Sequence, residues 1–289
     1  MIITNTNNLP RPLVEAVSRQ RTPTENSISI TTLISPPQIR ILTMRHWEGI
    51  EEDASDRLWA TMGSLMHVLL EGHAGGLPDH HAERTLDTEV EGMRVTGTFD
   101  LFVEDGTVSD YKFVSVWTTM NGVKPEWTAQ LNLYAELLRR TGARVDALQI
   151  VAIYRDWSKN KANASNYPAQ QVQIFPVPLW SSEHSSSYLT ERVRLHRRAA
   201  GEIIQCTDEE RWARPTKYAL MKRGRKTALK LFDDRAAASS LAADASDLYV
   251  EERPGAQVRC ESYCAVARFC PQYKRFVTEM GGAIEVEEQ

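Results

Sequence analysis

The stretch from Thr96 to Val116, TGTFDLFVEDGTVSDYKFVSV, constrains the fold most, because it reads as two strands joined by a tight turn. Side chains of a strand alternate between its two faces, so Asp110 and Lys112 share a face of the second strand. In the first strand Asp100 lies on the polar face, opposite an apolar face made of Val95, Gly97, Phe99, Leu101 and Val103. The sequence Glu104-Asp105-Gly106 between the strands predicts a hairpin turn.

The length of this turn decides whether the two aspartates meet. A two-residue turn places Asp100 opposite Tyr111, whereas a three-residue loop with its glycine in the left-handed region places Asp100 opposite Asp110. We expect the three-residue loop, which brings the two β-carbons to about 5 Å. Carboxylates this close raise each other's pKa unless a cation lies between them, and a divalent metal with oxygen ligands suits that position. Lys112 would lie beside the metal and stabilise a developing oxyanion. The alternative is an ordinary solvated hairpin face.

Composition sets the class of protein and its compartment. With 289 residues, 42% of them hydrophobic and 25% charged, the chain suits a soluble globular protein of one large or two small domains. No apolar run approaches the ~20 residues of a membrane span, and the start lacks the layout of a signal peptide. We therefore expect a cytoplasmic protein without membrane contact. A net charge of -4 argues against a uniformly basic nucleic-acid coat but allows a local basic groove.

Helices are expected on both sides of this hairpin in the sequence. Residues 1–28 are polar and are expected to form a loosely attached tail, and Pro36-Pro37 opens a first helix. SDRLWATMGSLMHVLLEG predicts a well-packed helix in which Gly63 and His67 share a face, and the helix-destabilising glycine suggests that something approaches the backbone there. HAGGLPDHHAER reads as a loop and residues 88–92 as a strand. A helix between Pro125 and Gly142 places Gln130 and Tyr134 on one face. The apolar run 147–154 predicts a buried strand and 171–180 an edge strand.

The character of the chain changes at Cys206. Basic residues interleave with aromatic ones from there to Phe232, a pattern that suits a nucleic-acid backbone with stacked bases. KYALMK and KTALKLF predict a hairpin about Arg223-Gly224, followed by an Ala-rich helix and the strand DLYVEE. The sequence thus predicts a tail over 1–28, a core over 29–205 and a small α+β extension over 206–289.

The ordered set Gly63-x-x-x-His67, Gly97-Thr-Phe-Asp100, Asp110-Tyr-Lys112 and Gln130-x-x-x-Tyr134 resembles the PD-(D/E)XK nuclease superfamily, and most closely its RecB-like exonuclease branch, which includes phage-encoded and CRISPR-associated iron-sulfur exonucleases. The resemblance covers about residues 29–155 and implies a restriction-endonuclease-like α/β core, with a central mixed sheet flanked by helices. It implies that Mg²⁺ or Mn²⁺ is bound by His67, Asp100, Asp110 and the Tyr111 carbonyl. Asp100, Asp110 and Lys112 would be catalytic, and Gln130 and Tyr134 would contact DNA. Asp110 stands where many members have glutamate, and both occur in the superfamily.

The four cysteines, Cys206, Cys260, Cys264 and Cys270, are more readily free or metal-bound than disulfide-paired in a cytoplasmic protein. In the same branch, a C-terminal cysteine segment and one distant cysteine hold a [4Fe-4S] cluster, which here would staple the extension to the core. Cys206 departs from the CRISPR-associated pattern, because it follows the nuclease core instead of preceding it. A zinc site or unligated thiols are the alternatives, although a zinc-type CxxC pair is absent from the sequence.

Two functions remain at the level of sequence. One is a metal-dependent deoxyribonuclease, in particular an exonuclease acting on DNA ends, with a recombination or repair protein as a partner. The other is a non-catalytic DNA-binding or assembly subunit that keeps the fold and the cluster. The intact set Asp100, Asp110 and Lys112 favours the enzyme, because a degenerate site has no reason to retain all three. A phage-encoded chain would act in the host cytoplasm.

Overall fold

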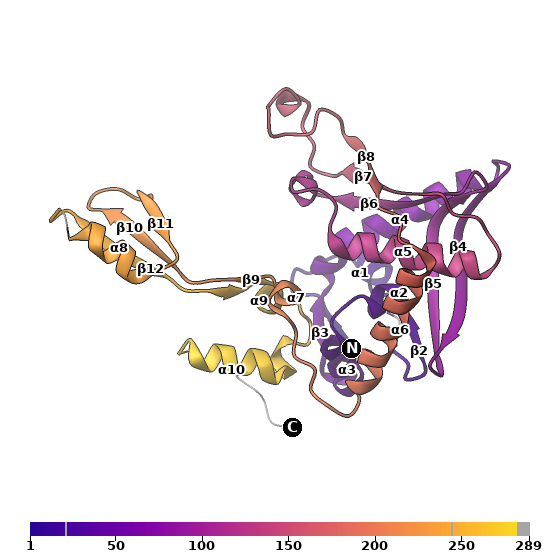
Figure 1. Ribbon diagram of the computed structural model, residues 1–289, viewed down its shortest axis with the longest axis horizontal. Helices are drawn as coiled ribbons and strands as arrows, with labels where there is room; N and C mark the ends of the chain where they lie inside the picture. The colour runs from indigo at the N-terminus through magenta and orange to yellow at the C-terminus, as the bar shows by residue number, and fades with distance from the viewer. Residues whose placement is uncertain (21, 244, 282–289) are drawn as a thin grey trace. The chain divides into compact units, whose positions relative to one another are not determined.

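The computed structural model describes residues 1–20, 22–243 and 245–281. The chain divides into two compact units, Met1–Ile204 and Gln205–Gln289, and each is described by itself (Figure 1). Residues 282–289 of the expected C-terminal extension lie outside the described residues. In the described ranges, every helix is too short or too polar to cross a membrane.

A mixed six-stranded sheet forms the centre of the first unit. Its strand order is β2-β5-β6-β7-β8, with β4 also paired to β5. β2 is parallel to β5 and β6 is parallel to β7, and the other neighbours are antiparallel. The strands are β2 (Ser27–Ser29), β4 (His80–Val90), β5 (Met93–Val103), β6 (Thr107–Val114), β7 (Ala147–Tyr154) and β8 (Val172–Val177). β8 is an edge strand, as Pro176 within it predicts.

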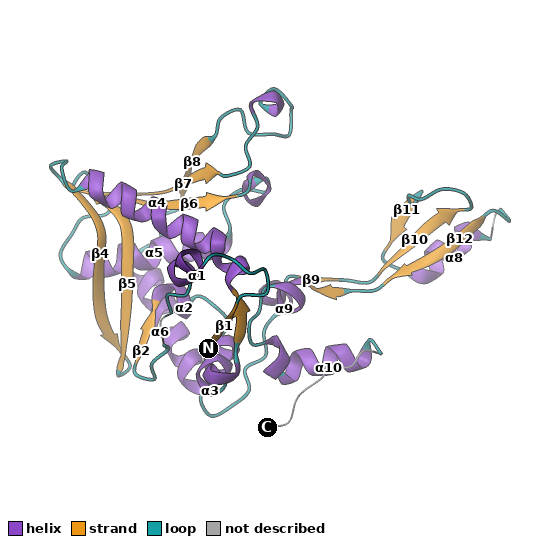
Figure 2. Cartoon of the chain, turned by 180° about the vertical axis from the view of Figure 1, so that it is seen from behind, coloured by secondary structure: helices purple, strands orange, loops and turns teal. Residues whose placement is uncertain are grey.

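Helices flank this sheet, which confirms the predicted α/β fold class (Figure 2). α5 (Pro125–Arg140) packs on β5, β6 and β7 and against α6 (Ser182–Arg198), while α4 (Leu58–Ala74) packs against β4 and β6. The other helical segments of this unit are α1 (Arg11–Val17), α2 (Ile30–Leu33), α3 (Pro37–Arg45), η1 (Trp47–Gly49), η2 (Ala54–Arg57), η3 (Val116–Thr119) and η4 (Lys159–Lys161).

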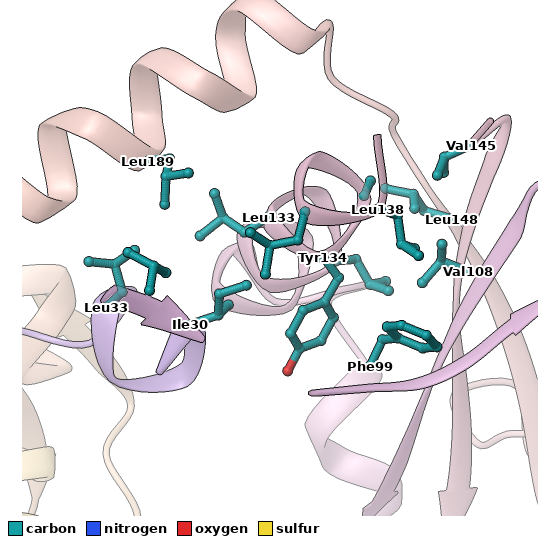
Figure 3. Close-up of a cluster of buried hydrophobic side chains, with 14 of the residues drawn as sticks. Ile30, Leu33, Phe99, Val108, Leu133, Tyr134, Leu138, Val145, Leu148 and Leu189 are labelled. Atoms are coloured by element: carbon teal, nitrogen blue, oxygen red, sulfur yellow. The ribbon is translucent and has the colours of Figure 1, made fainter. Parts of the chain in front are cut away.

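The hydrophobic core lies between α5, α2, α6 and the sheet (Figure 3). It includes Ile30, Phe99, Val108, Leu133, Tyr134, Leu138, Leu148 and Leu189. A Cβ on Gly97 would lie 2.6 Å from Ile30 Cδ1 and 2.9 Å from Leu137 Cδ1, so a glycine is needed where these side chains press on β5. This close packing fixes α5 over the strands that carry the two aspartates.

The β5–β6 hairpin has the three-residue loop that the sequence predicts. Val103 pairs with Thr107 and Leu101 with Ser109, which leaves Glu104, Asp105 and Gly106 in the loop. Gly106 has a φ of +95°, in the region that glycine adopts without strain. This register places Asp100 opposite Asp110, as expected.

One prediction for β5 is wrong: its faces do not alternate regularly to Val103. Phe99 and Asp100 are adjacent yet both buried, with 2% and 9% of their surface exposed. Before this point the odd-numbered residues face the core, whereas Asp100 and Phe102 face inward after it. The register alone sets Asp100 opposite Asp110, and the change of phase adds that Asp100 is turned into the protein and buried.

Residues 1–28 are not a loosely attached tail. β1 (Ile2–Thr4) pairs in parallel with β3 (Glu51–Asp53), and β2 belongs to the central sheet. The Asp53 carboxylate accepts hydrogen bonds from the Thr6 amide and hydroxyl at 2.8 Å each. Arg57 donates to the carbonyls of Val17 and Arg19 at 2.8 Å each. Polar contacts of this kind carry no hydrophobic periodicity, which is why composition alone suggested a tail.

Two further expectations near α4 are corrected. The first strand of the β4–β5 pair begins at His80, so residues 80–84 of the segment that read as a loop are strand. The α4 helix is not well packed all round, because Trp59, Leu65 and Val68 are 56%, 57% and 65% exposed. Helical spacing of apolar residues identified the helix but not the extent of its burial.

The second unit is a small α+β structure, as the sequence predicts. Its three-stranded sheet has the order β11-β10-β12, made of β10 (Lys217–Lys222), β11 (Lys230–Phe232) and β12 (Leu248–Arg253), with α8 (Arg235–Ala242) packed on it. β9 (Ala213–Arg214) pairs with β13 (Ala256–Gln257). The remaining segments are α7 (Asp208–Arg211), α9 (Val258–Ser262), η5 (Ala267–Phe269) and α10 (Pro271–Glu279).

A buried histidine on α6 makes the stability of the first unit depend on pH. His196 is 0% exposed, and its Nε2 lies 3.0 Å from the Leu33 carbonyl oxygen. Burial, with the charges of Arg192 and Arg40, lowers the pKa of His196 to about 4. The unfolded chain therefore takes up a proton below about pH 6.5 that the folded chain refuses. We expect the free energy of unfolding to fall as the pH drops from 6.5 towards 4, by about 3 kcal/mol from this group.

Denaturant unfolding of the wild type and His196→Gln between pH 7 and 4.5 measures this contribution. The variant is expected to be less stable at pH 7, and the gap should close as the pH falls, because glutamine carries no protonation penalty. Parallel pH profiles for the two proteins would contradict the assignment.

Candidate active site

Strands β5 and β6 separate beside the two aspartates. Their regular pairing ends at Leu101 and Ser109. Beyond it, Asp100 Oδ2 accepts a hydrogen bond of 2.6 Å from the amide of Tyr111, so a carboxylate takes the place of a strand carbonyl. Asp110 is 1% exposed, which leaves two carboxylates buried next to each other.

Lys112 is held at this site by a chain of polar contacts. Its Nζ lies 2.6 Å from Asp110 Oδ2 and donates to Gln130 Oε1 at 3.1 Å. Gln130 in turn donates to the Tyr134 hydroxyl at 2.8 Å. Gln130 and Tyr134 are only 8% and 4% exposed and orient the lysine from inside the protein, and their contact with DNA stays a prediction.

His67 and Glu83 complete the group from the α4 side. His67 Nδ1 lies 2.8 Å from Glu83 Oε1 and 3.5 Å from Asp100 Oδ1. One ligand atom from each of His67, Glu83 and Asp100 lies within 4.8 Å of the other two. Four residues named from sequence, His67, Asp100, Asp110 and Lys112, are therefore brought together as expected, with Glu83 added.

Glu83 was not predicted as a site residue, because its segment reads as a loop in the sequence. The register of β4 with β5 continues on both sides of it, with Ala82 opposite Leu101 and Arg84 opposite Phe99, so Glu83 faces Asp100. Its φ of +49° is uncommon for glutamate and interrupts the regular pairing at this point. The sequence did contain a signal for Glu83, the turn Glu91-Gly92. This turn sets the register between β4 and β5, and counting residue pairs away from it places position 83 opposite position 100.

The charges in the site are strongly perturbed. Burial, followed by the nearby Asp110 charge, raises the pKa of Asp100 to about 8. Burial also raises the pKa of Asp110, although the charge of Lys112 opposes this. The hydrogen bond to Glu83 raises the pKa of His67. Such a group holds protons that a cation would displace, so metal binding should release protons and strengthen with pH.

The donor set fits a divalent metal ion. Neither oxygen of Asp110 has a hydrogen-bond partner of good geometry among the described residues, although both are buried. Lys112 gives Asp110 a charge partner, but a buried carboxylate without hydrogen bonds still carries a desolvation cost of about 1–3 kcal/mol or more. Carboxylate oxygens with one imidazole nitrogen are ligands that Mg²⁺ and, more readily, Mn²⁺ accept.

If Glu83 is a metal ligand, Glu83→Gln should weaken Mn²⁺ affinity by at least about 100-fold. Mutating a residue that only hydrogen-bonds to a metal ligand already lowers metal affinity by about 10–100-fold. The amide keeps the size of the side chain and removes its charge. Titration calorimetry with Mn²⁺ measures the effect, with Glu89→Gln on the exposed face of β4 as the control. Equal affinities in the two variants would remove Glu83 from the ligand set.

The four cysteines lie together in the second unit. Burial raises the pKa of Cys206 to about 12, with further contributions from Glu210 and from Cys270, Cys260 and Cys264. Gln272 fixes Cys206 by bonding both its amide and its carbonyl at 2.9 Å. Because Cys206 also belongs to the second unit, the expected staple between extension and core is corrected: a group bound here would cross-link the second unit itself.

Comparison with solved structures gives partial similarities in fold. A protein described as SSO0001 matches with a TM-score of 0.43 at 18% identity, over 63% of this chain and 81% of that one. The alkaline exonuclease LHK-Exo from Laribacter hongkongensis matches with a TM-score of 0.39 at 10% identity, over 66% and 94%. Its complex with dAMP matches with a TM-score of 0.34 at 10% identity, over 65% and 92%.

No protein-family model and no curated protein matches the chain. The solved neighbours include exonucleases, at identities too low to transfer an activity. The function is therefore argued from the side chains of the site.

Proposed function

We propose that this chain is a Mg²⁺- or Mn²⁺-dependent deoxyribonuclease of the PD-(D/E)XK superfamily, in its RecB-like branch, and that it hydrolyses phosphodiester bonds at DNA ends. One observation carries the proposal: His67, Glu83 and Asp100 offer ligand atoms within 4.8 Å of one another, beside Asp110 and Lys112. Buried titratable side chains that converge in this way are typical of functional sites.

His67, Glu83, Asp100 and Asp110 would hold the ion, with the Tyr111 carbonyl as a further ligand. When bound, the ion supplies an activated water and neutralises charge on the phosphate. The part of the chain itself is to place these donors rigidly. Asp100 is fixed by the Tyr111 amide at 2.6 Å, and His67 is oriented by Glu83 at 2.8 Å.

Lys112 would stabilise the charge that develops on the phosphate during hydrolysis. Its ammonium is 2.6 Å from Asp110 and is aimed by Gln130 at 3.1 Å. The Tyr134 hydroxyl accepts a hydrogen bond from the Gln130 amide and so orients it, which holds the Lys112 ammonium in position before substrate binds. Preorganised donors of this type contribute about 10²–10³ to a rate.

The alternative function is a non-catalytic DNA-binding or assembly subunit. A linear duplex and a covalently closed circle of the same sequence, incubated with the protein and Mg²⁺ or Mn²⁺, separate the possibilities. Loss of the linear duplex alone supports an exonuclease. Nicking of the circle makes the enzyme an endonuclease, and binding without cleavage of either supports the non-catalytic reading.

We further propose that Cys206, Cys260, Cys264 and Cys270 bind a [4Fe-4S] cluster that stabilises the second unit. Four mutually close thiols supply the required ligands. A tetrahedral zinc with the same four thiolate ligands is the alternative.

Anaerobically purified protein is expected to contain about four irons and four sulfides per chain and to absorb near 400 nm, as a cluster with four thiolate ligands would. Replacing Cys260 with serine should remove the colour and make the second unit sensitive to protease, while the first unit stays folded. One zinc per chain without colour would change the metal, and metal-free protein would refute both versions.

The proposal implies DNA as the main partner and a recombination or repair protein as a second one. It also implies action in the cytoplasm, which for a phage-encoded chain means the cytoplasm of the host.

A further inference from the structure

Three residues of α4 lie along one face of the helix and lead away from the candidate metal site. Trp59, Gly63 and His67 are spaced four residues apart, which keeps them on one side of a helix with about 40° of rotation between successive members. At a rise of 1.5 Å per residue, Trp59 and His67 are about 12 Å apart along the axis. His67 marks the end of this stripe at the metal site, where it contacts Glu83 and Asp100.

Gly63, in the middle of the stripe, has no structural partner that requires a glycine. Beyond the backbone of its own helical turns, a Cβ built on it meets no atom of the described residues within 4 Å. A glycine inside a helix costs about 1 kcal/mol relative to alanine, and packing in this unit does not explain it, in contrast to Gly97. The helix therefore leaves open space beside its backbone, one turn from His67.

Trp59, at the other end, combines an exposed ring with a cation. Trp59 is 56% exposed, and the Arg155 guanidinium lies 4.5 Å from the ring centroid. Arg155 follows β7, and its amide donates to the Val114 carbonyl at 3.0 Å, which fixes it at the end of β6 two residues beyond Lys112. An aromatic face beside a fixed arginine suits a nucleobase together with its phosphate.

We propose that the stripe of Trp59, Gly63 and His67, with Arg155, is a track for one strand of DNA leading to the metal site. A base would stack on Trp59, Arg155 would pair with a phosphate, and the backbone of the strand would pass Gly63. The length of about 12 Å corresponds to three to four stacked nucleotides at about 3.4 Å each. This inference rests on the proposed nuclease function and adds to it a subsite for a single-stranded segment.

A nucleobase explains these features better than a second copy of the chain does. The stripe carries one aromatic ring, one cation and a bare stretch of backbone, whereas Leu65 and Val68, the more apolar exposed residues, lie on the opposite side of α4. A protein partner would be expected to cover that apolar side instead.

The test uses full-length protein, with Asp110→Asn as background in the binding measurements to prevent cleavage. Single-stranded oligonucleotides carry 2-aminopurine at successive positions from one end. Stacking on Trp59 should quench the probe at one or two positions, three to four nucleotides from the end held at the metal site. Trp59→Leu should remove this quench and weaken affinity about tenfold, and Trp59→Phe should restore most of both.

Gly63→Ala should raise the melting temperature, because helix propensity improves, and yet weaken strand binding and slow cleavage in an otherwise wild-type chain. Arg155→Gln should weaken DNA binding and make the remaining affinity less dependent on salt concentration. Leu65→Ala is the matched control, and its DNA binding should be unchanged. Position-independent quenching, or Trp59→Leu and Gly63→Ala variants that bind and cleave as the wild type does, would overturn the track. So would a Trp59→Leu variant that changes only the oligomeric state. If the wild type fails to degrade DNA at all, the proposed function fails instead.

Discussion

Asp110→Asn is expected to reduce DNA hydrolysis by on the order of 10³-fold or more, while the protein becomes no less stable. The carboxylate is 1% exposed, and burial raises its pKa, so ionised Asp110 destabilises the metal-free protein. The amide has almost the same shape without that charge. It also relieves the neighbouring carboxylate, because the Asp110 charge contributes to the raised pKa of Asp100.

Two measurements on the same preparation check this expectation. Initial rates on end-labelled duplex give the loss of activity, and thermal unfolding without metal gives the stability. Asp87→Asn, an exposed change on β4, is the matched control. A variant that keeps wild-type turnover would exclude a catalytic role for Asp110, and a large drop in melting temperature would mean that its charge is structural.

Lys112→Ala is expected to reduce hydrolysis by about 10³-fold and, unlike Asp110→Asn, to destabilise the metal-free protein by up to about 3 kcal/mol. The alanine leaves Asp110 buried without its charge partner at 2.6 Å. A bound divalent ion would supply the missing positive charge, so added Mg²⁺ should restore stability without restoring activity. Lys112→Arg should fail to rescue the rate, because a planar guanidinium does not reproduce a compact ammonium.

Denaturant unfolding with and without Mg²⁺ tests the stability half of this expectation, and the double variant Asp110→Asn with Lys112→Ala provides the control. The double variant should regain the metal-free stability that Lys112→Ala alone loses, because neither charge then remains buried. Additive losses in the double variant would show that Lys112 does not act through Asp110.

The meeting of Asp100 and Asp110 was predictable because it depends on local rules. The loop Glu104 to Gly106 sets the register, and period-two alternation puts Lys112 beside Asp110. The inward turn of Asp100 was not predictable in the same way. It depends on the break in the alternation of buried and exposed residues after Phe99 in β5. This break lies opposite Glu83 of β4, whose φ is positive.

Burial was the quantity that the sequence predicted least well. Four-residue spacing showed that Gln130 and Tyr134 share a face of α5, but only the packed structure shows that this face lies inside, against Lys112. The same spacing on α4 suggested a packed helix, whereas Trp59 and Leu65 are largely exposed. Helical periodicity identifies which residues share a face and leaves open what covers that face.

The most direct test of the proposed nuclease is the release of nucleotides from end-labelled DNA by purified protein, first in EDTA and then after addition of Mg²⁺ or Mn²⁺. We expect no release in EDTA, progressive release from the end after metal is added, and none from Asp110→Asn under either condition. Release in EDTA, or none with either metal from folded wild-type protein, would contradict a metal-dependent nuclease.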